Sequence, residues 1–343
     1  MSEARGELLR IENLNKTFAV RGRLFGPKLR LKALQDINFS IDRGETLGIV
    51  GESGCGKSTL GRCILQLLTP DNGRVLWLGN DLMKLSAEEM RKRRCDMQII
   101  FQDPLASLNP RMTVGEIVAD PLLMLMPELN AEQRRQRVID MMQAVGLQPE
   151  MINRYPHEFS GGQAQRIGIA RALITEPKLI VCDEPVSALD VSIQAQILNL
   201  LSELKDQFGL TLIFISHNLS VVRHVSDRII VLYLGRMVEL APGDDLYNDP
   251  KHPYTKALLT AVPIPDPRRA RERRIDALKG EIPSPFNQPS GCTFRTRCRY
   301  ALPKCAEILP PLDVPGEGRQ VACIRWEEID DAPGMEASDA PAD

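Results

Sequence analysis

Short, continuously apolar runs recur along this chain, and longer segments of mixed character separate them. Four of these runs are long enough for a strand and carry few charges: 45–50, 179–183, 211–216 and 229–234. Such runs are typical of parallel strands that are buried on both faces of a sheet. The intervening segment 191–208 is a predicted helix. Strands that alternate with helices predict an α/β fold with a mainly parallel sheet at its core.

The N-terminal part has a different pattern. Segments 8–14 and 33–41 are predicted to form antiparallel strands. A basic, glycine-containing segment at 21–32 lies between them, and we expect an exposed loop there. The sequence does not indicate a role for this loop.

Residues 84–175 form a mostly helical insertion in this interpretation. Asn130 is a good N-cap, and Gln133 stands at the position that completes a capping box. Apolar residues then recur at helical spacing, and Gly146 can end the helix. We expect the apolar residues to pack in the core: Val138, Met141, Met142 and Val145.

Composition and charge narrow the class of protein. The net charge of -2 argues against non-specific binding to nucleic acid, which needs clustered basic residues. No apolar run approaches the roughly 18 residues that a membrane-spanning helix requires. The first ten residues lack the apolar core of a signal peptide. We therefore expect a cytosolic protein whose membrane role, if it has one, depends on partner proteins.

The segment GESGCGKS at 51–58 fits the phosphate-loop pattern G-x-x-x-x-G-K-[ST] and lies between a predicted strand and a predicted helix. Glycines let the backbone wrap a phosphate, with N–H groups pointing inward at a helix N-terminus. Lys57 can reach the β- and γ-phosphates, and Ser58 can bind Mg²⁺. The loop residues expected at the nucleotide are Gly51, Glu52, Ser53, Gly54, Cys55, Gly56, Lys57, Ser58 and Thr59.

An acidic pair, Asp183 and Glu184, lies at the carboxyl end of the predicted strand 179–183. A phosphate loop needs such a partner for its metal ion. Asp183 is expected to hold Mg²⁺, because ligands of open α/β sheets bind at the carboxyl ends of the strands. Glu184 is placed to polarise the attacking water. The chemistry predicted from these residues is hydrolysis of ATP.

The segment FSGGQ at 159–163 resembles the signature motif of ABC transporter ATPases, usually written LSGGQ. The resemblance covers nearly the whole chain and extends to further motifs. Gln102 resembles the Q-loop glutamine, Asp190 the D-loop aspartate and His217 the switch histidine. Phe18 stands where the family places an aromatic residue that stacks on adenine. The resemblance implies an ABC-type nucleotide-binding domain with a phosphate-loop parallel sheet, an antiparallel β subdomain and a helical subdomain.

The same resemblance implies a mechanism. Two nucleotide-binding domains face each other head to tail and enclose two ATP molecules. Each ATP lies between the phosphate loop of one domain and the signature residues of the other, here Ser160, Gly161, Gly162 and Gln163. Glu184, His217 and Gln102 are the expected catalytic residues, and the implied Mg²⁺ ligands are Ser58, Gln102 and Asp183. ATP closes the dimer, and hydrolysis opens it.

The C-terminal region indicates which subgroup of the ABC transporter ATPases this chain resembles. HPYT at 252–255, GEIPSP at 280–285 and a cysteine group resemble the ATP-binding subunits of dipeptide, oligopeptide and nickel importers. We assign 7–245 to the ATPase domain, 246–326 to an importer-type extension and 327–343 to an acidic, disordered tail. The charge run at 268–274 is expected to be a solvated face.

Four cysteines crowd into the extension: Cys292, Cys298, Cys305 and Cys323. In a reducing compartment such a group indicates a metal or cluster site rather than two disulfides. The spacing is not that of a common zinc ribbon or a bacterial ferredoxin. With the importer resemblance, it favours a [4Fe–4S] cluster, and Zn²⁺ is the alternative. The cysteines lie far in sequence from every ATP motif, so we expect a structural role for this site.

The expected function is to power import of di- and oligopeptides at the cytoplasmic face of the inner membrane. The implied partners are a paralogous ATPase in a heterodimer, two permease subunits and, indirectly, an extracytoplasmic solute-binding protein, with no nucleic acid. One alternative is the ATPase of a nickel or other small-solute importer. A soluble ABC ATPase is another alternative, but such proteins commonly carry two ATPase units or a long coiled coil. A metal or redox sensor is a third, which the complete catalytic set disfavours.

Overall fold

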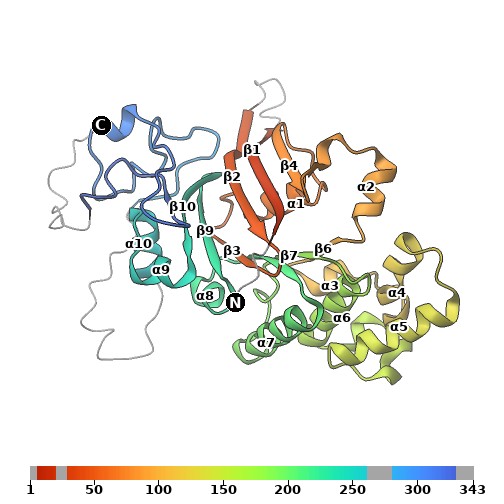
Figure 1. Ribbon diagram of the computed structural model, residues 1–343. Coiled ribbons are helices and arrows are strands. Elements are labelled where there is room, and N and C mark those ends of the chain that lie inside the picture. Colours follow the sequence, from red (N-terminus) through yellow and green to blue (C-terminus); the bar gives the residue numbers. More distant parts are fainter. Residues whose placement is uncertain (1–5, 21–28, 261–279, 330–343) are drawn as a thin grey trace.

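The computed structural model describes residues 6–20, 29–260 and 280–329 (Figure 1). The predicted charge run at 268–274 and residues 330–343 of the predicted tail lie outside the described residues. Residues 327–329 are described, and Ile329 is buried. The prediction that a disordered tail begins at 327 is therefore wrong for these three residues, because an apolar side chain near the end packs into the fold.

A seven-stranded sheet forms the centre of the molecule, in the order β11-β10-β9-β3-β8-β7-β6 (Figure 1). The strands from β9 to β6 are parallel, and β10 and β11 pair in the antiparallel direction. Every residue of β3, β7 and β8 is buried, which explains their continuously apolar sequences. The four strands predicted from apolar runs are confirmed. The bounds are β3 Thr46–Val50, β6 Met97–Ile100, β7 Leu179–Asp183, β8 Thr211–Ile215, β9 Arg228–Tyr233, β10 Arg236–Pro242 and β11 Gln320–Val321.

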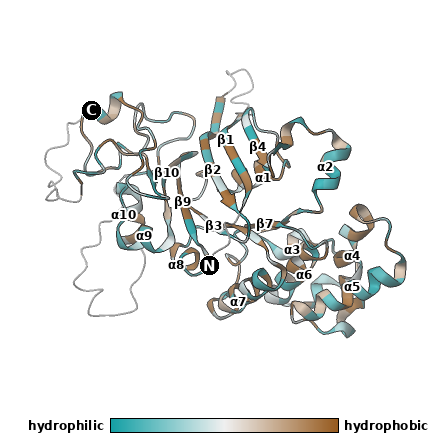
Figure 2. Ribbon diagram, viewed as in Figure 1, coloured by the Kyte–Doolittle hydropathy of each residue, from teal (hydrophilic) through white to brown (hydrophobic). Residues whose placement is uncertain are grey.

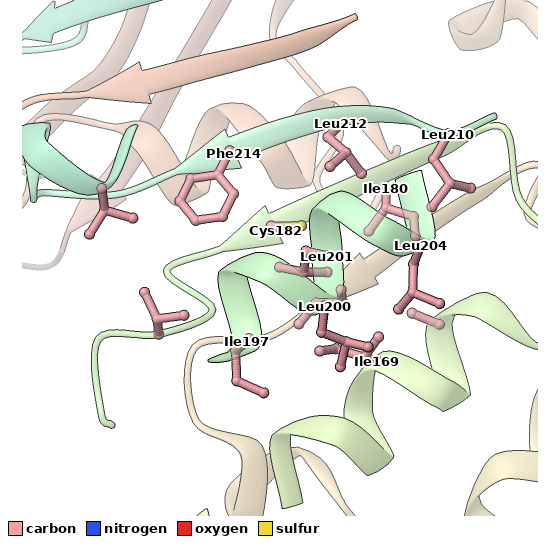
Figure 3. Close-up of a cluster of buried hydrophobic side chains, with 14 of the residues drawn as sticks. Ile169, Ile180, Cys182, Ile197, Leu200, Leu201, Leu204, Leu210, Leu212 and Phe214 are labelled. Carbon is pink, nitrogen blue, oxygen red and sulfur yellow. The ribbon is translucent and has the colours of Figure 1, made fainter. Parts of the chain in front are cut away.

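Helices cover this sheet and bury an apolar core against it. Leu201 and Leu204 of α7 lie against Ile180 of β7 and Leu212 of β8 (Figure 3). Hydrophobic residues gather in the central strands, whereas α2 and α5 carry mainly hydrophilic residues (Figure 2). The helices that follow the strands are α1 Lys57–Ile64, α7 Val191–Phe208, α8 Leu219–Val225, α9 Gly243–Asn248 and α10 Pro253–Thr260.

A second, antiparallel sheet has the order β2-β1-β4-β5. Its strands are β1 Glu7–Val20, β2 Leu29–Asp42, β4 Asn72–Trp77 and β5 Asn80–Asp81. The first two strands are longer than predicted, and Val20 pairs with Leu29. The expected loop over 21–32 is therefore wrong for 29–32, because an edge strand tolerates basic side chains that face solvent. Residues 21–28 lie outside the described residues.

The predicted helical insertion contains a run of helices, which lie on the opposite side of the view from the C-terminal extension (Figure 1). It also contains β6, the edge strand of the central sheet. The Asn130–Gln133 capping box is confirmed, and Val138, Met141, Met142 and Val145 are buried as expected. The elements are α2 Ala87–Arg93, α3 Pro104–Ser107, α4 Val114–Leu125, α5 Ala131–Ala144 and α6 Gly161–Leu173, with short 3₁₀ turns η1 Leu82–Lys84, η2 Pro149–Asn153 and η3 Pro156–Glu158.

The C-terminal segment at 280–329 has little regular structure. It contains α12 Lys304–Glu307 and β11, and β11 pairs with β10 at the edge of the central sheet. Arg319 adds an ion pair to Asp249, with 2.9 Å between Nη1 and the carboxylate. This segment is therefore packed against the edge of the central sheet. Within the described ranges, no helix has the length and apolar character needed to cross a membrane.

Candidate ATP site

The phosphate loop joins the end of β3 to the start of α1 and follows a path that only glycine can take at two positions. Gly51 has a φ of 153°, and a Cβ there would lie 2.3 Å from the Leu232 carbonyl oxygen. Gly56 has a φ of 109°, and a Cβ there would lie 2.4 Å from the Ala33 carbonyl oxygen. These contacts explain the glycine spacing of the motif, because a side chain would push the loop out of shape.

Lys57 holds the loop together from inside. Its side-chain nitrogen donates to the Gly51 carbonyl at 2.8 Å and to the Glu52 carbonyl at 3.1 Å. The residue is only 5% exposed. An ammonium group that is buried beside carbonyl oxygens is well placed to bind a phosphate oxygen, because phosphate supplies the missing negative charge.

Ser58 and Asp183 form the group expected to bind magnesium. The Ser58 hydroxyl donates to the Asp183 carboxylate at 2.6 Å, although the two residues are 125 positions apart in the sequence. Asp183 ends the buried strand β7 and is itself buried. These are hard oxygen donors of the type that Mg²⁺ prefers, so the residues present fit this ion.

Glu184 is the centre of a small polar network. Its carboxylate accepts a hydrogen bond from the Gln102 amide nitrogen at 3.1 Å and lies 3.2 Å from His217 Nδ1. Glu184 has a φ of 49°, in the left-handed region that is uncommon for residues other than glycine. Backbone strain of this kind costs on the order of 1–3 kcal/mol and is frequent at active sites. The observed strain and the polar network both support a catalytic role for Glu184.

A cavity of about 610 Å³ brings most of these groups together. Of the residues expected at the nucleotide, ten line it: Phe18, Ser53, Gly54, Gly56, Lys57, Ser58, Thr59, Gln102, Glu184 and His217. Sequence reasoning missed Lys32 and Pro285, which also line the cavity. Lys32 belongs to none of the nucleotide motifs, and Pro285 belongs to GEIPSP, which indicated the importer subgroup and carried no expectation about ATP.

Three loop residues expected at the nucleotide lie outside the lining of the cavity. Gly51 lies at the base of the loop, and Cys55 is buried behind it. Glu52 faces away: its carboxylate pairs with Arg297 and its backbone N–H donates to the Tyr254 hydroxyl. The side chain and the N–H group of Glu52 are therefore engaged by the C-terminal region instead of by the cavity.

The signature residues do not line the cavity of their own chain. Ser160 caps α6, and its side chain and that of Gln163 form a reciprocal capping box. Ser160 and Gly161 are exposed, as is Asp190 at the start of α7. Val191 beside it is 82% exposed, which is unusual for an apolar side chain. These exposed residues leave the start of α6 and α7 open to contact by another molecule.

The four C-terminal cysteines converge on one small cavity of about 20 Å³, which Phe294 and His252 also line. Burial raises the pKa of Cys298 to about 12 and that of Cys323 to about 11, so both thiols stay protonated at neutral pH unless a cation binds. The donor set suits a thiolate-bound metal or cluster. No group of three or more potential ligands in the described ranges is already arranged to hold a metal ion.

Comparisons with known proteins show the family of this chain. A family described as "ABC transporter" matches residues 34–187, and one described as "Oligopeptide/dipeptide transporter, C-terminal region" matches 238–305. The oligopeptide transport ATP-binding protein OppF of Salmonella typhimurium is 57% identical, over 95% of this chain and 98% of the relative. OppF of Haemophilus influenzae is 56% identical, over 93% of this chain and 97% of the relative.

Solved structures give the same result for the ATPase core. The ATP-binding cassette MJ0796, as a dimer in a post-hydrolysis state bound to ADP and Pi, superimposes with a TM-score of 0.61 at 32% identity, covering 68% of this chain and 98% of that one. CbiO1 of Clostridium perfringens, part of the ABC transporter complex cbiONQ, has a TM-score of 0.61 at 29% identity, covering 71% and 91%. The chain belongs to the ATP-binding proteins of ABC transporters, in the branch that carries the oligopeptide/dipeptide transporter C-terminal region.

Proposed function

We propose that this chain hydrolyses ATP to power the import of di- and oligopeptides through an ABC transporter. The observation that carries the proposal is the cavity lined by Lys57, Ser58 and the Glu184 network, with Asp183 hydrogen-bonded to the Ser58 hydroxyl. The near full-length similarity to oligopeptide transport ATP-binding proteins supports peptides as the solute. The match to their C-terminal region disfavours a soluble ABC ATPase and an ATPase that serves another solute.

In the proposed mechanism, Lys57 and the backbone N–H groups of the loop bind the phosphates of ATP. Ser58, Asp183 and Gln102 would hold Mg²⁺, which would supply charge neutralisation at the transferred phosphoryl group. Phe18 packs against the adenine ring. These residues bind and orient ATP, and the low exposure of Lys57 and Asp183 strengthens their electrostatic effect.

Glu184 polarises the attacking water in this scheme and accepts its proton. His217 supports it: with a proton on Nδ1, the ring donates to Glu184 at 3.2 Å. Gln102 donates to the same carboxylate at 3.1 Å. These two contacts orient the Glu184 carboxylate, which lines the cavity.

The second half of the site comes from a partner subunit. Ser160, Gly161, Gly162 and Gln163 lie at an exposed helix start, where backbone N–H groups can bind the γ-phosphate of an ATP held by another domain. Asp190 lies on the same exposed surface. We favour a paralogous ATPase in a heterodimer that works on two permeases at the cytoplasmic face of the inner membrane. An extracytoplasmic solute-binding protein delivers the peptide.

The isolated chain should be a weak ATPase, because each site lacks the donors that the partner contributes. Addition of the paralogous ATPase and the permeases should raise turnover on the order of 100-fold, the effect typical of restoring preorganised N–H donors. Steady-state phosphate release at several protein concentrations measures this. Full activity of a monomer, independent of concentration and partners, would refute the shared site.

The cysteine cavity is proposed to hold a [4Fe–4S] cluster, with Zn²⁺ as the alternative. Protein purified without oxygen should be brown and contain about four irons per chain. Replacing Cys298 and Cys305 by Ser should remove the metal and lower the melting temperature, whereas Cys95→Ser, in the helical region, should do neither. If the protein is colourless and contains zinc, the alternative is correct. If the protein contains neither metal and the double variant is as stable as the wild type, the proposed metal site does not exist.

A further inference from the structure

Two parts of the C-terminal region converge on one residue of the phosphate loop. The Arg297 guanidinium donates to both carboxylate oxygens of Glu52, at 2.7 and 3.0 Å. The Tyr254 hydroxyl accepts the backbone N–H of Glu52 at 3.0 Å. The side chain and the backbone of Glu52 are thus bound separately, by residues more than 200 positions away in the sequence.

The Arg297–Glu52 pair is well shielded from solvent. The Arg297 side chain is 5% exposed and that of Glu52 is 20% exposed. The bidentate contact to Glu52 raises the pKa of Arg297, so its charge is permanent. A two-bond pair of this geometry restricts both position and orientation of the carboxylate, which a single contact to lysine would not do.

An aromatic cluster fixes Arg297 in turn. The rings of Tyr233 and Tyr254 lie 4.7 Å apart between centroids, and Phe294 packs at 5.3 Å from each. The Arg297 guanidinium lies 5.9 Å from the centre of the Tyr233 ring. Tyr233 belongs to β9 of the central sheet, whereas Phe294 belongs to the cysteine segment. The cluster therefore packs the cysteine segment directly against the central sheet.

Glu52 also contacts Lys57 from its other side, through its carbonyl oxygen at 3.1 Å. A shift of Glu52 would move an anchor of the ammonium group that we assign to phosphate binding. We infer that Arg297 is a positioning residue for ATP: it touches no nucleotide but holds the first turn of the phosphate loop through Glu52, so that the loop is preorganised before ATP arrives. This inference rests on the proposed ATP site but on neither the solute nor the metal.

Arg297→Ala in the full-length chain should weaken Mg–ATP binding about tenfold, because it leaves a shielded carboxylate unpaired and frees the loop. Arg297→Lys should give an intermediate loss. Arg319→Ala is the matched control. Arg319 forms a comparable ion pair in the same region, but its partner Asp249 does not belong to the phosphate loop. Titration with a fluorescent ATP analogue measures affinity, and thermal unfolding is recorded in parallel.

The double variant Glu52→Gln/Arg297→Ala tests whether Arg297 acts through Glu52. In the Glu52→Gln background, the further loss on Arg297→Ala should be less than about twofold, as expected for partners in one contact. In the assembled transporter, KM for ATP should rise while kcat changes little. If Arg297→Ala does not fold, Arg297→Lys and Glu52→Gln replace it in the ATP titration. Each should weaken ATP binding at least about threefold.

Wild-type affinity in these variants, or an equal loss in Arg319→Ala, overturns the positioning role. A wild-type chain that binds no ATP contradicts the proposed function itself, so the two failures are distinguishable.

Discussion

Glu184→Gln should lower ATP turnover by the assembled transporter on the order of 1,000-fold and leave ATP binding intact. Glutamine keeps the size of the side chain and an oxygen that can accept from Gln102, but it cannot take a proton from water. ATP should therefore remain bound between two closed subunits. Phosphate release and nucleotide retention after gel filtration measure the two effects.

Glu176→Gln is the control for this variant. Glu176 has a φ of 52°, close to the 49° of Glu184, and its carboxylate lies 3.9 Å from the Arg137 guanidinium. It lies outside the cavity, so its replacement should leave turnover within about twofold, as for most surface changes. Near-normal turnover of Glu184→Gln would show that another group activates the water.

Gly56→Ala should lower ATP affinity on the order of 100-fold, through a clash that the backbone cannot relieve. The added Cβ would lie 2.4 Å from the Ala33 carbonyl oxygen at a φ of 109°, so either the loop or β2 must move. Lys57 follows directly and would lose its alignment. Titration with a fluorescent ATP analogue at constant Mg²⁺ measures the loss.

Gly79→Ala separates this clash from the cost of an unusual backbone conformation. Gly79 has a φ of 79°, yet nothing lies within 4 Å of a Cβ built there. We expect a loss of about 1 kcal/mol in the free energy of unfolding and no change in ATP affinity. Unchanged ATP affinity in Gly56→Ala would contradict the shape assigned to the loop.

The parts of the fold predicted from sequence are those that depend on local patterns. Buried parallel strands need continuous apolar runs, and the phosphate loop needs its glycines at fixed spacing, so both could be recognised. The capping box at Asn130 was predictable for the same reason. Strand ends were less predictable: β2 begins at Leu29, where pairing with Val20 decides the structure and the basic sequence does not.

Contacts between distant segments could not be predicted. The cysteine group lies far in sequence from every ATP motif, and this distance was the reason to expect a structural role alone. In the structure Arg297, the neighbour of Cys298, forms a bidentate ion pair with the phosphate loop across 245 positions. Sequence separation does not reveal this contact, because the extension packs back onto the sheet that carries the loop. Pro285 reaches the cavity for the same reason.

The role of the signature residues stays a prediction, because the site they complete belongs to another subunit. A capping box at Ser160 explains why serine and glutamine suit this helix start, and exposure explains how a partner could reach it.

The most direct test of the central claim is uptake of a labelled oligopeptide into sealed vesicles that hold the assembled transporter, with the ATPase subunits facing an ATP supply and the binding protein on the other side. The account predicts that peptide accumulates only with ATP and wild-type chain, and that Glu184→Gln abolishes accumulation while ATP stays bound. Equal accumulation with Glu184→Gln, or ATP hydrolysis that never moves peptide, would contradict it.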